Sequence, residues 1–272
     1  MAFQYFSRNG KILPISEAVV PLSSVEYSYG FGVYETIRVK NKNPIFLSDH
    51  LSRLMDSAKI IGLEHLFSEN EIAKYISELI NKNAVETCNL KILLIGAPSR
   101  EEAQLDIICL NPLFPDKKIY RDGAELITCE YERPFPHAKS LNMLNSYLAY
   151  RQARQAGAYD ALLLNRHGFI TEGTRTNFFC LKDKIIFTPP EAEILPGVTR
   201  KKLLELAQEN GYKIEEKNIK PEDLINYDSV FISSTSSKIV PIKKIDELIL
   251  NPPPDALKKL MSLFDNFLET SN

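Results

Sequence analysis

The sequence predicts a mixed α/β (α+β) protein with two domains. Of its 272 residues, 44% are hydrophobic and 25% charged, the balance of a soluble globular chain that can bury a sizeable core. Strand-like and helix-like apolar patterns alternate along the chain. A stretch rich in proline and charge, residues 111–122, interrupts this pattern, which restarts after it. We therefore expect a smaller N-terminal domain over residues 1–118 and a larger C-terminal domain over residues 119–272.

The N-terminal half has the pattern of a hairpin, a long strand and an amphipathic helix. Asn9-Gly10 is a two-residue turn signal, and Gly32–Lys40 alternates as a half-buried strand does. Ser48-Asp49 is typical of a helix cap. Arg53 lies nearly opposite the apolar stripe of this helix, so periodicity alone predicts that it faces solvent. The predicted elements are strands at 3–6, 11–15, 32–40 and 44–47, helices at 48–61 and 69–83, and strands at 90–95 and 105–110.

The C-terminal half continues the alternation of strands and helices. Gly168 marks a turn, and Gly211 follows a helix as a stop signal. The predicted elements are a strand at 125–129, a helix at 142–156, strands at 161–164, 176–181 and 184–187, a helix at 197–210, strands at 213–216 and 229–233, and a last helix from about 255.

Charge and cysteine usage exclude several classes of function. The formal net charge of −2 argues against a nucleic-acid-binding surface, which is usually basic. The four cysteines form no C-x-x-C pair, which favours buried thiols in a reducing compartment. The first five residues lack the features of a signal peptide, and no apolar run is long enough to cross a membrane. We expect a cytoplasmic protein that binds neither nucleic acid nor a membrane.

Two stretches have the composition of anion-binding sites. Gly197-Val198-Thr199-Arg200 stands at a predicted helix start, where free backbone amides and the helix dipole favour an anion. Ser233-Ser234-Thr235-Ser236-Ser237 follows an apolar strand and can present several donors to a phosphate. Taken alone, each stretch is more often an ordinary helix start or a solvated loop.

Two charged residues, Lys139 and Glu172, lie beside or within predicted elements of the C-terminal half. Lys139 comes shortly before a predicted helix, and Glu172 lies in a short strand flanked by turns. Taken alone, both are typical of exposed surface charges. The chain has no G-x-S-x-G serine motif and no H-E-x-x-H metal motif, and its four histidines have no ligand spacing, so we expect no metal site.

Taken together, five motifs resemble the class IV aminotransferase family, which includes D-amino acid and branched-chain aminotransferases and aminodeoxychorismate lyase. They follow the order of the family and span nearly the whole chain. The motifs are Tyr29–Glu35, His50–Leu54, Lys139–Asn142 with Glu172-Gly173, Leu195–Arg200 and Ser234–Ser236.

The resemblance implies a two-domain fold-type IV enzyme with pyridoxal 5'-phosphate in the cleft between its domains, and a homodimer. It implies that Lys139 forms a Schiff base with the cofactor and moves the substrate proton, and that Glu172 pairs with the pyridine nitrogen. It places Tyr34 near the lysine and the substrate, and Asn177 as structural support. The remaining cofactor-binding residues that it implies are Leu195 on the ring and Arg53, Val198, Thr199, Ser234, Thr235 and Ser236 on the phosphate.

The sequence departs from the family where the substrate carboxylate is expected to bind. The resemblance implies an arginine before a glycine at the place of Ile95-Gly96. Arg38 is the first candidate to replace it, and Arg100 and Arg133 are weaker candidates. The leading function is a transaminase for a small amino acid of the D-amino acid or branched-chain type. The alternative is 4-amino-4-deoxychorismate lyase, which eliminates pyruvate and gives 4-aminobenzoate. A cofactor-binding protein without catalysis is the rival from another class.

Overall fold

The computed structural model describes residues 3–112 and 114–270, and it has the mixed α/β content that the sequence predicts. Contacts group the chain into two compact units. The first contains residues 3–112 and His137–Met143, and the second contains Phe114–Pro136 and Leu144–Thr270. The linear domain boundary at residue 118 stays a proposal, because the segment His137–Met143 groups with the first unit.

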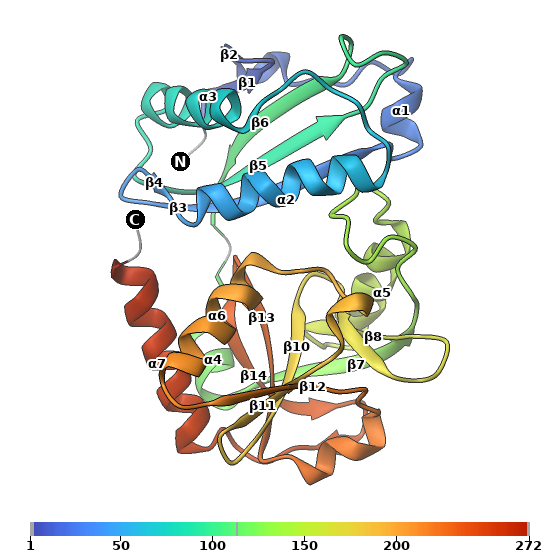
Figure 1. Ribbon diagram of the computed structural model, residues 1–272, viewed down its shortest axis with the longest axis vertical. Coiled ribbons are helices and arrows are strands. Elements are labelled where there is room, and N and C mark those ends of the chain that lie inside the picture. The colour runs from blue at the N-terminus through green and yellow to red at the C-terminus, as the bar shows by residue number, and fades with distance from the viewer. Residues whose placement is uncertain (1–2, 113, 271–272) are drawn as a thin grey trace. The chain divides into compact units, whose positions relative to one another are not determined.

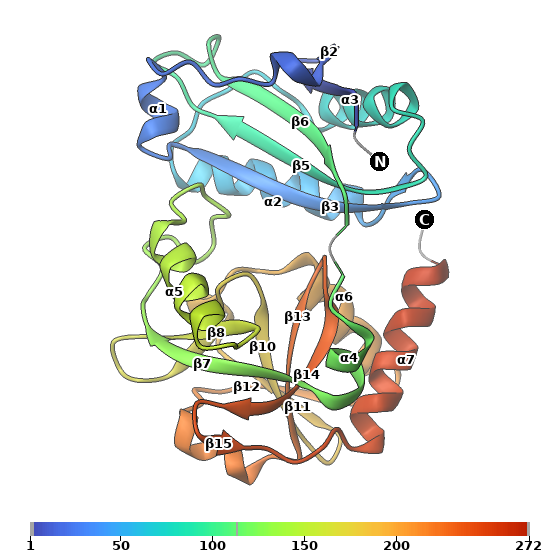
Figure 2. The same cartoon turned by 180° about the vertical axis from the view of Figure 1, so that it is seen from behind.

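The first unit is built on a six-stranded antiparallel sheet with the strand order β2-β1-β6-β5-β3-β4. Two helices, α2 and α3, cover one face of this sheet (Figure 1). Figure 2 shows the opposite face. The elements are β1 (Tyr5–Arg8), β2 (Lys11–Pro14), a 3-10 helix (Ile15–Glu17), α1 (Val25–Ser28), β3 (Gly32–Lys40), β4 (Asn43–Pro44), α2 (Leu47–Ile60), α3 (Glu69–Lys82), β5 (Thr87–Ile95) and β6 (Gln104–Leu110).

Local sequence explains most of these elements. Asn9 and Gly10 both have positive φ (49° and 80°), as a tight hairpin turn requires, so the predicted hairpin is confirmed. The predicted cap at Ser48-Asp49 is wrong. Helix α2 already begins at Leu47, because Phe46 takes a left-handed conformation (φ 56°) and turns the chain into the helix without a side-chain cap.

The second unit is built on a nine-stranded sheet with the order β12-β11-β10-β13-β14-β7-β8-β9, and β15 pairs with β14. A further pairing joins β9 to β10, which closes part of the sheet into a ring at Glu172 and Asn177. The elements are α4 (Lys117–Asp122), β7 (Ala124–Glu130), α5 (Leu144–Gln155), β8 (Asp160–Leu164), β9 (Ile170–Gly173), β10 (Asn177–Lys182), β11 (Ile185–Thr188), a 3-10 helix (Glu191–Glu193), α6 (Val198–Glu209), β12 (Lys213–Glu216), a 3-10 helix (Pro221–Asn226), β13 (Ser229–Ser234), β14 (Lys238–Ile245), β15 (Leu248–Ile249) and α7 (Asp255–Thr270).

Two expectations about this half are corrected. The stretch 111–122 is not only a linker, since its end forms α4, which Asp116 caps by accepting from the Lys118 amide at 2.8 Å. Leu113, inside the same stretch, lies outside the described residues. Strand β14 has no counterpart among the predicted elements although it lies inside the sheet. Its Pro241 is a residue that sheets usually confine to their edges.

Helices α5, α6 and α7 pack on the second sheet, as α4 does on β14. Phe179 and Phe231 stack with their ring centroids 4.8 Å apart and belong to the same core as Phe264 of α7 and Leu203 of α6. Helices α6 and α7 lie side by side (Figure 1). Helix α5 buries Ala149 and Ala153 in a smaller core with β8. This packing holds the start of α6 close to the end of β13.

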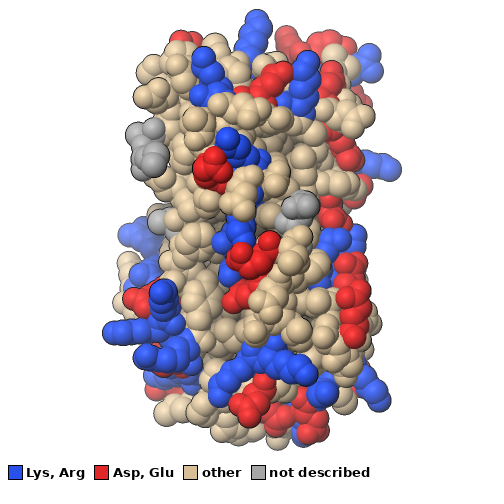
Figure 3. Space-filling view, turned by 90° about the vertical axis from the view of Figure 1, so that its left-hand side faces the viewer, with Lys and Arg blue, Asp and Glu red and all other residues tan. Residues whose placement is uncertain are grey.

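Charges of both signs are interspersed on the surface. The face in Figure 3 carries basic side chains among acidic ones. Exposed side chains of opposite sign also pair, as Lys243 and Glu125 do at 3.0 Å. None of the helices in the described part of the chain has the length and apolar character that a membrane crossing requires.

Candidate active site

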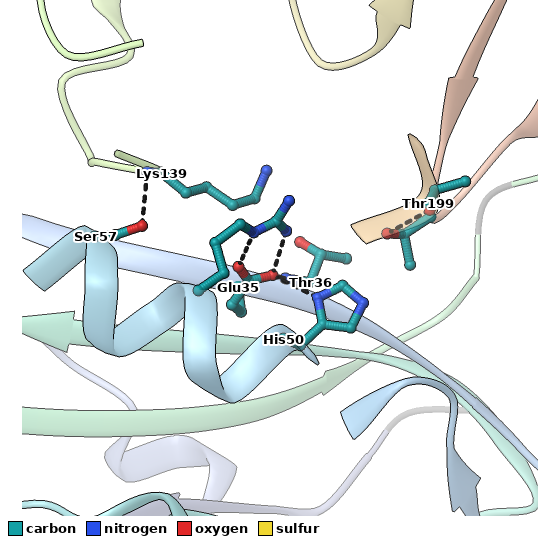
Figure 4. A network of polar contacts seen from close by, with 8 residues as sticks. Glu35, Thr36, His50, Ser57, Lys139 and Thr199 are labelled. Atoms are coloured by element: carbon teal, nitrogen blue, oxygen red, sulfur yellow. Dashed lines mark hydrogen bonds and ion pairs between the residues drawn. The ribbon is translucent and has the colours of Figure 1, made fainter. Parts of the chain in front are cut away.

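The backbone of Lys139 is fixed at the start of β3 in the first unit. The Lys139 carbonyl accepts from the Tyr34 amide at 2.9 Å, and the Leu141 amide donates to the Gly32 carbonyl at 2.8 Å. The Lys139 amide donates to the hydroxyl of Ser57 on α2 at 3.0 Å (Figure 4). Gly32 permits this pairing, since a Cβ there would lie 2.8 Å from both Leu141 Cδ1 and a backbone oxygen of β5. These contacts therefore fix the backbone position from which the Lys139 side chain extends.

The side chain of Lys139 lies over the ring of Tyr34. Its Nζ is 4.7 Å from the ring centroid, and the Tyr34 hydroxyl contacts Met143 Sδ at 3.7 Å. A second ammonium group, Lys91 Nζ, is 5.6 Å from the same centroid. The structure thus brings together Lys139 and Tyr34, as expected, and adds Lys91, which the sequence did not single out.

A buried charged network lies on the other face of β3. Arg53 donates from Nε and Nη2 to the two carboxylate oxygens of Glu35, at 2.7 and 2.8 Å, and His50 Nδ1 contacts the same carboxylate at 2.8 Å (Figure 4). The prediction that Arg53 faces solvent is wrong: Arg53 is buried, because Glu35 is a fully buried partner for its charge.

The charges in this network set each other's protonation. Burial by itself raises the pKa of Glu35, but the Arg53 charge and the His50 hydrogen bond outweigh it and hold that pKa well below its usual range. Burial lowers the pKa of His50, although the bond to Glu35 opposes this. The network therefore contains a carboxylate, a guanidinium and a neutral imidazole. One signal could have revealed it: Glu35 is the lone charge on the apolar face Val33, Ile37 and Val39 of its strand.

Glu172 is at the point where β9 meets β10 in the second unit. The expectation of an exposed residue is wrong, because Glu172 is only 3% exposed and pairs with Arg133, whose Nη1 lies 3.1 Å from Oε1. The Leu195 amide donates to Oε2 at 3.4 Å. The carboxylate is therefore held by a cation and a backbone amide in a dry environment.

The start of α6 collects the predicted phosphate donors of the second unit. Val198 and Thr199 are buried in its first turn, after the N-cap Gly197. The hydroxyls of Thr199 and Thr235 meet at 3.4 Å, so the helix start and the β13–β14 turn converge. Ser234 instead bonds within its own turn, to the Ser237 hydroxyl at 2.7 Å. Ser236 lies in the same turn and is half-buried.

Asn177 joins the strand of Glu172 to this helix start. It pairs with Glu172 in the sheet register, and its side-chain amide donates to the Leu195 carbonyl at 2.9 Å. A Cβ on Gly197 would lie 2.0 Å from Asn177 Oδ1, so only glycine fits there without a shift. Leu195, expected on the cofactor ring, is buried beside them. The predicted site residues thus fall into two groups. Lys139, Tyr34, Arg53 and Arg38 belong to the first unit, and the others to the second.

Comparison with known proteins gives a consistent result. Residues 32–245 match the family described as "Amino-transferase class IV". The D-alanine aminotransferase of Bacillus licheniformis is 34% identical over 247 residues, which cover 88% of this chain and 87% of that protein. The branched-chain amino acid aminotransferase of Escherichia coli has a similar structure, with a TM-score of 0.90, 25% identity and coverage of 100% and 95% of the two chains.

Two further structures bear on cofactor and chemistry. The branched-chain amino acid aminotransferase of T.th., solved with pyridoxamine 5'-phosphate, matches with a TM-score of 0.89, 27% identity and coverage of 98% and 94%. A Legionella pneumophila protein provisionally assigned as a 4-amino-4-deoxychorismate lyase matches with a TM-score of 0.82, 27% identity and coverage of 92% and 97%.

Proposed function

Because the chain belongs to the class IV aminotransferase family, we propose that it is a pyridoxal-phosphate-dependent transaminase of a small amino acid. The substrate is of the D-alanine or the branched-chain type, the two activities that the names of its similar proteins carry. The amino group of this substrate passes to a 2-oxo acid in a second half-reaction. The observation that carries the proposal is the amine of Lys139, fixed at its backbone and directed onto the ring of Tyr34.

The residues present fit the needs of pyridoxal phosphate. Its aldehyde needs an amine, and among the residues that the structure describes no carboxylate lies within ion-pairing distance of Lys139. Its pyridine nitrogen needs an acidic partner, which the buried Glu172 supplies. Its phosphate needs donors, which the amides of Val198 and Thr199, the Thr199 and Thr235 hydroxyls and Arg53 offer. When bound, the cofactor supplies an electron sink for the substrate Cα.

Each residue then has a defined task. Lys139 Nζ would take the proton from the substrate Cα and deliver it to the cofactor, and water would then release the 2-oxo acid while the amino group stays on the cofactor. Glu172 would hold the pyridine nitrogen in its protonated form. Tyr34 orients the lysine through its ring. Leu195 would pack on the cofactor ring and exclude water from it.

We also propose a cytoplasmic homodimer. Apolar side chains are exposed along the segment from Ile15 to Tyr29, among them Val19 (62%), Leu22 (103%) and Tyr29 (83%), and such a patch favours association. All four cysteines are free thiols, which suits a reducing compartment. Sedimentation equilibrium of the holoenzyme should give twice the chain mass, and a monomer would contradict the homodimer.

The alternative, 4-amino-4-deoxychorismate lyase, is favoured by the similarity to the Legionella protein. Two assays separate the functions. A transaminase consumes D-alanine or leucine only when a 2-oxo acid is present, whereas the lyase releases pyruvate from 4-amino-4-deoxychorismate without an acceptor. Lys139→Ala should abolish either activity, with Lys11→Ala on the distant β2 as the control. Turnover of Lys139→Ala at the native rate would contradict the role of Lys139.

A further inference from the structure

The position of Ile95 carries no charge that could bind the carboxylate of an amino acid. Ile95, which is 6% exposed, stands before Gly96, at the place where the family resemblance leads us to expect an arginine. Arg100 is largely exposed and pairs with Glu101 at 2.9 Å. Arg133 pairs with Glu172 in the second unit. Both arginines therefore already have carboxylate partners, and the substrate cation has to come from elsewhere.

Lys91 lies beside the reacting lysine. It is opposite Thr36 in the register of β5 on β3, two positions from Tyr34 along β3, so Tyr34 and Lys91 share one face of the sheet. Lys91 Nζ and Lys139 Nζ are 5.6 and 4.7 Å from the same Tyr34 ring centroid. The gap between the two nitrogens is therefore no wider than the sum of these distances.

Lys91 carries a charge that no acidic side chain among the described residues balances. Among the described residues, no carboxylate lies within ion-pairing distance of Lys91 or of Lys139. Lys91 is also half-buried rather than extended into solvent. When Lys139 bonds the cofactor, the charge of Lys91 remains beside the Tyr34 ring, and the carboxylate of a substrate would supply the anionic partner that the described residues do not.

Arg38 fits this position less well than Lys91. It lies four residues along β3 from Tyr34, about 13 Å at roughly 3.3 Å per residue. Lys91, by contrast, already reaches the ring that Lys139 contacts. An amino acid whose nitrogen would displace Lys139 Nζ from the cofactor has its carboxylate carbon only two bonds from that nitrogen, on the side of Tyr34 where Lys91 also lies.

We propose that Lys91 binds a carboxylate of the substrate, in place of the arginine that the family resemblance implies at Ile95. The inference rests on the proposed function, since it takes Lys139 as the amine that the substrate amine would displace. It makes Lys91 a residue that selects for amino acids over plain amines. The charge of Lys91 forms a hydrogen-bonded ion pair with the carboxylate.

A binding experiment on the holoenzyme tests this without turnover. The probes are 4-methylvalerate, a substrate-shaped carboxylate without an amine, its neutral amide, and glutarate, with dissociation constants from calorimetry. Lys91→Met should weaken binding of a carboxylate by about 10- to 100-fold and leave the amide unchanged, since only the ion pair is lost. Loss with 4-methylvalerate assigns Lys91 to the α-carboxylate, and loss with glutarate alone assigns it to a distal one.

Two variants serve as controls. Lys91→Arg keeps the charge and should bind 4-methylvalerate within a few-fold of the native enzyme. Lys82 also lies over a tyrosine ring in this unit, 4.8 Å from the Tyr5 centroid, and Lys82→Met should have no effect. Unchanged binding of both carboxylates to Lys91→Met, or equal loss of the amide, would overturn the inference. Failure of the native chain to take up pyridoxal phosphate would instead overturn the proposed function.

Discussion

Arg53 holds Glu35 at two points inside the first unit, with Nε on Oε1 at 2.7 Å and Nη2 on Oε2 at 2.8 Å. The pair links α2 to β3, and His50, three residues earlier on the helix, contacts the same carboxylate. A two-point pair fixes the plane of the guanidinium as well as its position. The orientation of Arg53, which we propose to bind the cofactor phosphate, is therefore set before any ligand arrives.

Removing the carboxylate should destabilise the protein strongly. Glu35→Ala leaves the buried Arg53 charge without its partner, so we expect a loss of about 3–5 kcal/mol in the free energy of unfolding. The control is Glu78→Ala, which breaks the exposed pair with Lys74 at 3.9 Å and should cost less than about 1 kcal/mol. Urea unfolding measures both. Equal, small losses would contradict the account of the network.

Stability should fall as the solution becomes acidic. Burial lowers the pKa of His50 from its ordinary 6.5. Below pH 6.5, His50 therefore binds a proton more readily in the unfolded chain than in the folded one. The free energy of unfolding then drops by at most about 1.4 kcal/mol per pH unit. The pKa of Glu35 is also lowered, so protonation of this residue reduces the free energy of unfolding further only below pH 4.5, its ordinary pKa. His50→Asn should flatten the slope between pH 6.5 and 4.5, and an unchanged slope in urea titrations would count against this.

Gly197 and Asn177 should be energetically coupled. Gly197→Ala places a Cβ against Asn177 Oδ1 and should cost about 1–3 kcal/mol by overpacking. In the Asn177→Ala background the opposing atom is gone, so the same change should cost less. A double-mutant cycle by urea unfolding measures the difference. Additive effects would mean that the two residues do not act together.

The hydroxyls at the start of α6 should strengthen cofactor binding. Thr199→Val removes one donor but keeps the helix amides, so we expect the affinity for pyridoxal phosphate to fall by about tenfold, or roughly 1.4 kcal/mol. Thr87→Val, an exposed threonine of β5, is the matched control. Fluorescence titration of the apoenzyme gives the two affinities. The same affinity in both variants would remove Thr199 from the phosphate site.

Local patterns predicted much of the fold. The bounds of β3 and β12 agree with their predicted ranges, because alternation and turn residues define them locally. Strand β14 has no local signal of this kind, since Pro241 breaks the pattern of a central strand and only its neighbours β13 and β7 stabilise it. The bridge between Val33 and Ser140, which places the Lys139 segment in the first unit, is equally non-local.

The candidate site was predictable in its residue types and not in its partners. Lys139, Glu172 and Thr199 lie in motifs that the sequence displays directly. The partners Glu35 and Arg133 depend on which elements pack together, and Lys91 depends on the register of β5 on β3. Register follows from the hydrophobic pattern of whole strands and from turns, so single residues do not reveal it.

The most direct test of the account is reduction of the holoenzyme with borohydride, followed by mass mapping of its peptides. The backbone of Lys139 is held by hydrogen bonds to the Tyr34 amide and to the Ser57 hydroxyl. The side-chain amine of Lys139 is the group that we propose to bond the cofactor. If Lys139 bonds the cofactor, reduction should abolish the visible absorption band and leave a single pyridoxyl group on the peptide that contains Lys139. A pyridoxyl group on another lysine, or none at all, would contradict it.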